Sequence, residues 1–155
     1  MIWKTPHITK VYEALGAIGD ERILVSDNSA KVYSSSRNKY YDVGYSPIDN
    51  AIMSNDNSSY WKDELGYPSI ALLIKLGVLP NDQEMPLALK DIAWKDINQK
   101  YKNDFDKTMN EVDEIIETRG YSKSKLHEFC NLVLNKIEAI SLVQLGGKRK
   151  PPEGY

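Results

Sequence analysis

Apolar residues near the N-terminus recur every three or four positions, which is the period of one helical face. They are Ile8, Val11, Tyr12, Leu15 and Ile18. Thr5 and Pro6 supply an N-cap and a first helical residue, and Gly19 can end the helix in a left-handed conformation. The pattern therefore predicts a helix from about residue 6 to about residue 18.

The period then changes from helical to strand-like. Residues 22–26, 30–34 and 39–45 are short apolar and aromatic runs, and clusters of turn-forming polar residues separate them. We expect an antiparallel meander of three strands, and residues 51–53 are a candidate for a short fourth strand. One face of such a sheet packs against helices while the other face meets water.

A run of six small polar residues, 54–59, follows the meander. Such side chains compete with the backbone for hydrogen bonds, so we expect a loop here rather than a helix or a strand. Functional groups are frequent on loops, which makes this run the first candidate for a site. The candidate ligand-binding residues are Asn55, Asp56, Asn57, Tyr60, Trp61 and Tyr67.

Two interpretations of this run remain open. As a structural seam, it holds the sheet against the helix that begins at Pro68, through caps and turns, with Tyr60 and Trp61 as anchors. As a site, it lacks the central Gly and the final Glu of an EF-hand loop, and neither His nor Cys lies nearby in the sequence. A bound ligand is then expected to be neutral and polar, or the backbone of a partner, rather than a metal or a phosphate.

The second half of the chain has helical periodicity. Residues 68–76 are apolar almost all round and predict a buried helix, and a short helix follows over 86–92. Residues 94–116 predict one long amphipathic helix, and a second runs from Ser122 or Ser124 to Ile140. The predicted fold class is α+β, with an N-terminal helix, a three- to four-stranded antiparallel meander and a helical half that ends in a long antiparallel helix hairpin.

The length of 155 residues suits one domain with a substantial core. We expect a single domain over residues 1–145, β-rich over 20–54 and helical over 67–145. The last ten residues, 146–155, have the basic and Pro-containing composition of a flexible tail.

Composition narrows the range of functions. Twenty basic and twenty-two acidic residues give a net charge of −2, whereas duplex-binding proteins usually carry a basic excess. Cys130 is the only cysteine, which fits a reducing compartment, and the longest apolar stretch is too short to cross a membrane. We therefore expect a cytoplasmic protein without a membrane partner.

The sequence carries no recognisable catalytic motif. His7, His127 and Cys130 have no catalytic partner at a characteristic spacing, and the chain lacks metal-ligand and phosphate-binding glycine patterns. We expect no cofactor, no metal and a role without catalysis. An enzyme acting at residues 54–61 is a third hypothesis, and it requires Asp56 or Asp63 to lie in a cleft with a raised pKa.

We favour a small binding or assembly module of unknown specific role over this enzyme hypothesis, and two kinds of interaction are open for such a module. The first is a homo-oligomer, with a dimer favoured, that forms through the apolar stripe of the long helices. Its candidate interface residues are Trp94, Tyr101, Phe105, Phe129 and Ile137. The alternative is binding of single-stranded nucleic acid by aromatic and basic side chains of the sheet. Its candidate residues are Lys31, Tyr33, Arg37, Lys39 and Tyr41.

Overall fold

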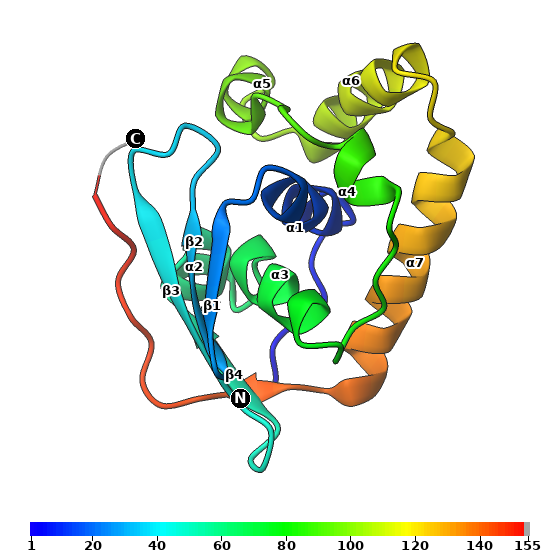
Figure 1. The fold of residues 1–155 in the computed structure, drawn as a ribbon. Coiled ribbons are helices and arrows are strands. Elements are labelled where there is room, and N and C mark those ends of the chain that lie inside the picture. Colours follow the sequence, from blue (N-terminus) through cyan, green and yellow to red (C-terminus); the bar gives the residue numbers. More distant parts are fainter. Residues whose placement is uncertain (154–155) are drawn as a thin grey trace.

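The computed structural model of the chain describes residues 1–153 and confirms the predicted α+β fold class (Figure 1). Within these residues the elements, in chain order, are α1 (Thr9–Gly19), β1 (Ile23–Ser26), β2 (Ser29–Tyr33), β3 (Tyr40–Ser46), β4 (Ala51–Ser54), α2 (Asn57–Lys62), α3 (Tyr67–Lys75), α4 (Met85–Ala88), α5 (Trp94–Lys100), α6 (Phe105–Thr118), α7 (Lys123–Ile140) and β5 (Val143–Gln144).

The strands form one sheet in the order β1-β2-β3-β4-β5. The first four are antiparallel neighbours, as the meander pattern predicts, and the candidate fourth strand is β4. Alternation along β2 decides which face is packed, because Ala30 and Val32 are buried while Lys31 between them is exposed. Ala30 pairs with Val43, and Val32 pairs with Tyr41, so the buried face continues into β3. The two-residue strand β5, which the sequence pattern does not predict, joins β4 in parallel.

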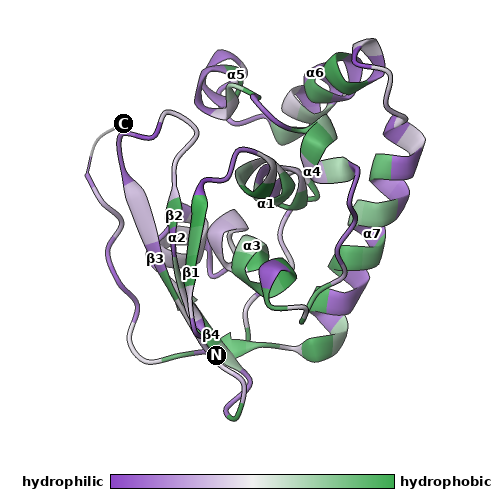
Figure 2. Cartoon of the chain, viewed as in Figure 1, coloured by the Kyte–Doolittle hydropathy of each residue, from purple (hydrophilic) through white to green (hydrophobic). Residues whose placement is uncertain are grey.

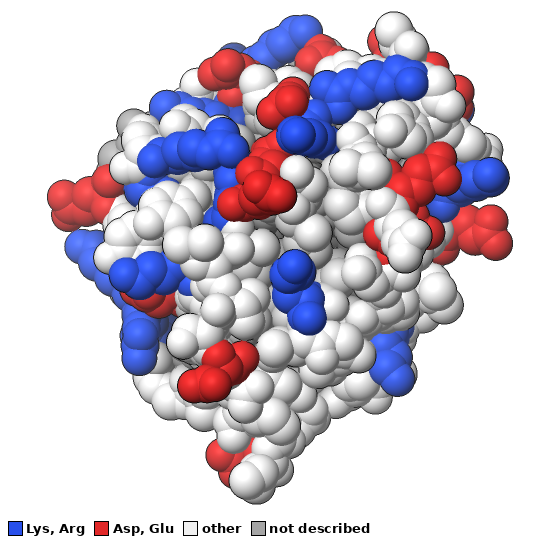
Figure 3. Space-filling view, viewed as in Figure 1, with Lys and Arg blue, Asp and Glu red and all other residues white. Residues whose placement is uncertain are grey.

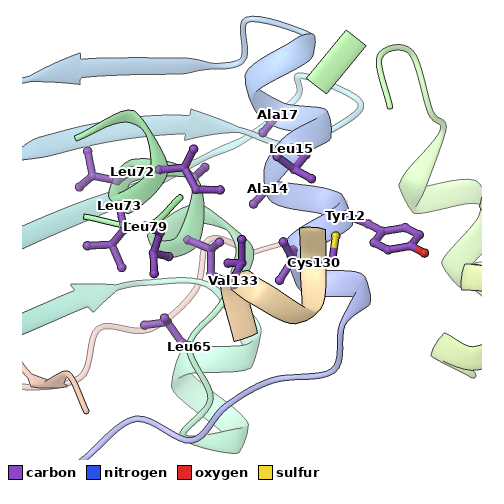
Figure 4. Close-up of a cluster of buried hydrophobic side chains, with 14 of the residues drawn as sticks. Tyr12, Ala14, Leu15, Ala17, Leu65, Leu72, Leu73, Leu79, Cys130 and Val133 are labelled. Carbon is purple, nitrogen blue, oxygen red and sulfur yellow. The ribbon is translucent and has the colours of Figure 1, made fainter. Parts of the chain in front are cut away.

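Helix α3 occupies the centre of the molecule, between the sheet and α1 (Figures 1 and 2). Its residues from Pro68 to Ile74 are all buried, which explains why the helix is apolar almost all round. Helix α7 packs on the far side of α1. Figure 4 shows buried side chains of α1, α3 and α7 in one cluster, with Cys130 and Val133 of α7 among them. Tyr12 belongs to the same cluster, and its ring points to the side of α1 that faces away from α3.

The N-terminal segment and the chain after α7 both lie against β4. Trp3 is buried, its indole N–H donates to the carbonyl of Ile52 at 2.8 Å, and its backbone N–H donates to Leu142 at 3.0 Å. After β5 the chain runs along the sheet (Figure 1), and the ammonium group of Lys148 pairs with the Asp63 carboxylate. The division into a domain of residues 1–145 and a flexible tail stays a prediction, and residues 154–155 of that tail lie outside the described residues.

The expected single helix over residues 94–116 is wrong, because the structure has two helices, α5 and α6, in its place. Lys102 and Asn103 interrupt it with φ angles of 51° and 62°, in the left-handed region that ends a helix. Asp104 then acts as an N-cap, and its carboxylate accepts the backbone N–H of Lys107 at 3.4 Å. The apolar spacing continues through the break, so hydrophobic periodicity alone does not detect it.

Candidate functional site

A cavity of about 580 Å³ lies where α1, α2, the α5–α6 region and the segment from β2 to β3 meet. This volume is within the range of ligand pockets in proteins. Its lining contains mostly polar and aromatic side chains from segments that are far apart in the sequence. The lining residues are Lys10, Glu13, Arg22, Ser34, Ser35, Ser36, Lys39, Tyr41, Asp56, Asn57, Ser58, Trp61, Lys62, Tyr67, Trp94, Lys95, Asn98, Gln99, Lys102, Asn103 and Phe105.

The polar run 54–59 forms one wall of this cavity, and it is not the loop expected from its composition. Ser54 ends β4, and residues from Asn57 onward form α2. The reason is Asp56, which is an N-cap: its carboxylate accepts the backbone N–H of Ser59 at 3.3 Å and the Ser59 hydroxyl at 2.6 Å. The polar side chains that favour a loop therefore also start a short helix.

Asp56 is a buried carboxyl group at the edge of the cavity, with only 4 % of its surface exposed. Burial raises the pKa of Asp56, and the hydrogen bonds from Ser59 oppose that rise. Gly66 packs directly against it, because a Cβ atom there would lie 1.9 Å from Oδ2. Asp63 differs, since its hydrogen bond with Lys148 lowers its pKa. Asp56 thus has the two properties that the enzyme hypothesis requires of an acid, although these properties do not define a reaction.

Two tyrosines and one arginine form one part of the lining, in which Tyr41 and Arg22 are buried and Tyr67 is half-buried. The rings of Tyr41 and Tyr67 meet edge to face, with centroids 6.1 Å apart. Burial raises the pKa of Tyr67, the Tyr41 hydroxyl adds to the rise, and the nearby Arg22 opposes it. Arg22 is 2 % exposed and is fixed by Asp20, whose carboxylate accepts its Nε–H at 2.9 Å, and by the carbonyl of Tyr33 at 2.6 Å. The guanidinium group is therefore rigidly placed at the cavity wall.

A hydrogen-bond network joins α1 to the α5–α6 region across the cavity. The buried ammonium group of Lys10 donates to Glu13 at 3.0 Å, and the other Glu13 oxygen accepts the side-chain amide of Asn98 at 3.0 Å. The Asn98 carbonyl accepts the hydroxyl of Thr108 at 3.1 Å. Lys10 also lies 4.3 Å from the ring centroid of Phe105. The network fixes the α5 wall relative to the body of the protein.

Lys39, Lys95 and Lys62 add positive charge to the lining. Partial burial lowers the pKa of Lys39, and the positive charge of Lys95 lowers it further. Lys62 lies 5.3 Å from the ring centroid of Phe105, on which Lys10 also packs. Several cations from different elements are thus directed to one small volume.

Trp61 is the most exposed aromatic residue of the lining, with 69 % of its surface exposed. Tyr60 stacks on it with ring centroids 4.6 Å apart and planes within 6° of parallel. Trp94 is in contrast buried, and its indole N–H, which makes no hydrogen bond within residues 1–153, lies close to Gly16. Exposed Trp61 does not fit the role of an anchor that the seam interpretation gives it.

The structure brings four of the six candidate ligand-binding residues to the cavity: Asp56, Asn57, Trp61 and Tyr67. The other two, both described, have structural contacts outside the lining. The side-chain oxygen of Asn55 accepts the backbone N–H of Asp42 at 2.8 Å and so ties the run to β3, and Tyr60 covers Trp61. The run therefore supplies both a seam and a wall of the cavity.

The candidate nucleic-acid residues do not form one surface. Lys39 and Tyr41 line the cavity, with Lys39 Nζ 5.6 Å from the Tyr41 ring centroid. Lys31 lies 4.8 Å from the ring centroid of Tyr40, which also contacts Tyr33. Arg37 donates to the carbonyl of Asp20 at 3.1 Å. Single-stranded nucleic-acid binding to a continuous sheet surface stays a prediction.

The candidate oligomer residues separate into two groups. Trp94 and Ile137 are buried in the core of their own chain, with 3 % and 4 % of their surface exposed. Tyr101 and Phe129 are partly exposed and pack against that core. Phe105 is also partly exposed, and its ring contacts the ring of His7 with centroids 5.8 Å apart. The apolar stripe of the long helices is thus largely covered within one chain, and self-association stays a prediction.

The sequence analysis did not identify the lining residues of α1, of α5 and of the turn just before β1. The most important of them are Lys10, Glu13, Arg22, Lys95 and Asn98. One signal was available, because Lys10 and Glu13 stand three residues apart within an apolar helix and end up buried together. Such a pair at helical spacing indicates a polar contact inside the fold. The meeting of α1 with α5 is tertiary and has no local signal.

Three observations concern the rest of the described structure. Basic and acidic side chains are interspersed over the face shown in Figure 3, so no extended patch of one charge covers it. Residues 1–153 hold no cluster of three or more His, Cys, Asp or Glu side chains suited to a metal ion. Among the described helices, none is both long enough and apolar enough to cross a membrane.

Residues 3–143 match the family described as "Uncharacterised conserved protein UCP014422". The match spans most of the chain, so the protein belongs to this family. Neither the curated proteins nor the solved structures gave a match.

Proposed function

We propose that this protein is a small binding module whose cavity takes a small anionic ligand. The observation that carries the proposal is the charge of the lining: among the described residues it contains six basic side chains and two acidic ones. The basic residues are Lys10, Arg22, Lys39, Lys62, Lys95 and Lys102, and the acidic residues are Glu13 and Asp56. The whole chain has a net charge of −2, so this excess is local.

The burial of these groups strengthens the argument. Lys10 and Arg22 are at least nine-tenths buried, and each is held by an acidic neighbour, Glu13 or Asp20. Partial burial and the positive charge of Lys95 lower the pKa of Lys39, so these two lysines bring like charges into the same part of the lining. A bound anion would be attracted by these charges, because a concave wall lined mainly by one sign of charge concentrates ions of the opposite sign.

This proposal replaces the expectation of a neutral polar ligand. That expectation considers only residues 54–61, in which Asp56 is the one charged residue. The cavity adds basic residues that lie outside that run, among them Lys10 of α1, Arg22 just before β1 and Lys95 of α5. The ligand class therefore depends on the tertiary structure.

The test is calorimetric titration of inorganic pyrophosphate into the full chain and into the K39Q/K95Q variant at low ionic strength. We expect the wild-type protein to bind, with an affinity that falls as salt is added, and the variant to bind at least about tenfold more weakly, the factor equivalent to 1.4 kcal/mol. The control is K75Q/K136Q, which removes the same charge at two exposed lysines outside the lining. Equal loss in both variants, or no binding at millimolar pyrophosphate, would contradict the proposal.

Self-association through the C-terminal helices is a second proposal. It is supported by Leu132 of α7, which is 55 % exposed, and by the partly exposed Phe129 one turn before it. Light scattering at high micromolar concentration tests it directly: a dimer that L132E converts to a monomer supports it, and a strict monomer of the wild-type chain ends it.

A further inference from the structure

The aromatic residues of the lining restrict what kind of anion the cavity would hold. Trp61 lines the cavity while Tyr60, also among the described residues, does not. The Tyr60 ring is stacked in parallel on the indole at 4.6 Å, so it covers one face of Trp61. The part of Trp61 that borders the cavity is therefore not the part that Tyr60 covers, and with 69 % of its surface exposed the indole is open to contact there.

The position of Trp61 is also fixed. Its helix α2 begins at the Asp56 cap, and Ser59, two residues before Trp61, is 2 % exposed and bonded to that cap. Lys148 donates to the carbonyl of Tyr60 at 3.2 Å and so holds the same turn from the other side. A large apolar ring that is fixed in place and left open at a polar cavity is a stacking surface for a planar group.

We propose that the ligand is an anion that carries a planar aromatic ring, the chemistry of a nucleotide, with the ring stacked on Trp61 and the anionic group among the lining lysines and Arg22. This inference rests on the proposed anion-binding function and adds the ring to it. The cavity of about 580 Å³ has room for more than an inorganic anion. The same chemistry has two sources, a free nucleotide or an unpaired nucleotide of a strand.

The experiment measures the affinity of the full chain for four probes: adenosine 5′-monophosphate, ribose 5-phosphate, adenosine and a short 5′-phosphorylated oligodeoxythymidylate. Stacking of a base on an aromatic side chain is worth about 1–3 kcal/mol, which converts to roughly 5- to 150-fold in affinity. We expect adenosine 5′-monophosphate to bind more tightly than ribose 5-phosphate by a factor in that range. The oligonucleotide separates the sources, because a strand ligand binds more tightly than the mononucleotide and a free nucleotide does not.

Variants of Trp61 assign the effect to the ring. W61L keeps an apolar side chain without a π surface and is expected to remove the advantage of adenosine 5′-monophosphate over ribose 5-phosphate, whereas W61F retains part of it. Trp61 is 69 % exposed, so neither substitution removes a core side chain, and circular dichroism checks that each variant folds. Equal binding of the two phosphates by the wild-type chain overturns the inference while the anion site stands. Absence of binding by every phosphate probe overturns both.

Discussion

Gly66 is the position where one added methyl group tests the account of the cavity wall most sharply. A Cβ atom there would lie 1.9 Å from Oδ2, 2.5 Å from Cγ and 2.7 Å from Oδ1 of Asp56. No pair of these atoms tolerates such distances, so G66A must displace the Asp56 carboxylate. The backbone itself accepts alanine, because the φ of −84° and ψ of 167° at Gly66 are extended.

The magnitude follows from what the displaced carboxylate loses. An N-cap is worth about 0.5–2 kcal/mol, and the second bond, from the Ser59 hydroxyl to a carboxylate, about 1.5–3 kcal/mol. Replacing glycine by alanine at a compatible position returns about 0.4–1 kcal/mol through the unfolded state. We therefore expect G66A to lower the free energy of unfolding by about 2–3 kcal/mol, a change of about 4–12 °C in Tm for a chain of this size.

Urea unfolding followed by circular dichroism measures this cost, and a double-mutant cycle assigns it. D56A removes all three atoms that the new methyl group would meet, so in the D56A background G66A is expected to cost nothing and to return only the about 0.4–1 kcal/mol of the glycine replacement. A coupling energy of about 3 kcal/mol then separates the two backgrounds. Additive costs in the double variant, or a G66A protein as stable as the wild type, would refute the packing of Asp56 against Gly66.

Three further predictions concern the framework of the site. G19A is expected to destabilise the protein by about 2–3 kcal/mol, because a Cβ atom at this position would lie 2.0 Å from the carbonyl oxygen of Pro86. The control in the same urea assay is G147A, whose Cβ atom would meet nothing within 4 Å. Y12F removes the 2.8 Å hydrogen bond from the Tyr12 hydroxyl to the buried carboxylate of Asp113, which keeps His127 as its partner. The free energy of unfolding is expected to fall by about 1–3 kcal/mol, and an unchanged value would contradict this prediction. Folding raises the pKa of Asp56 above its ordinary 3.8, so the folded chain holds a proton on Asp56 at pH values where the unfolded chain has lost it. The contribution of this proton to the free energy of unfolding is therefore greatest below pH 3.8 and falls as the pH rises through the raised pKa. D56N, which keeps a good N-cap, is expected to flatten that slope in unfolding curves measured across pH, and an unchanged slope would be evidence against it.

Local patterns were enough to predict most of the fold. The helical period of residues 8–18 predicts α1, the alternation after residue 20 predicts the meander, and the apolar residues 70–76 predict the buried α3. Two failures have local causes that periodicity does not register. Lys102 and Asn103 adopt left-handed conformations within a continuous apolar stripe, and Asp56 turns a polar run into a capped helix.

The candidate site was predictable only in part, because residues 56–67 supply six of the 21 lining residues and several other segments supply the rest. Asp56, Trp61 and Tyr67 stand close together in the sequence and were identified as candidates for that reason. Arg22 and Asn98 reach the same cavity only after α1, the sheet and α5 have packed, and 76 residues separate them in the chain. The basic character of the lining, on which the ligand class depends, is therefore a property of the assembled fold.

Chemical-shift mapping with inorganic pyrophosphate on the ¹⁵N-labelled chain tests the central claim most directly. The account predicts progressive, saturable shifts of the Trp61 indole N–H and of the backbone amides of Ser36, Lys95 and Asn98, all in the cavity lining. The indole N–H of Trp3, bonded to Ile52 at 2.8 Å outside that lining, should stay unmoved. Shifts confined to residues away from the cavity, or a spectrum unchanged at millimolar pyrophosphate, would contradict it.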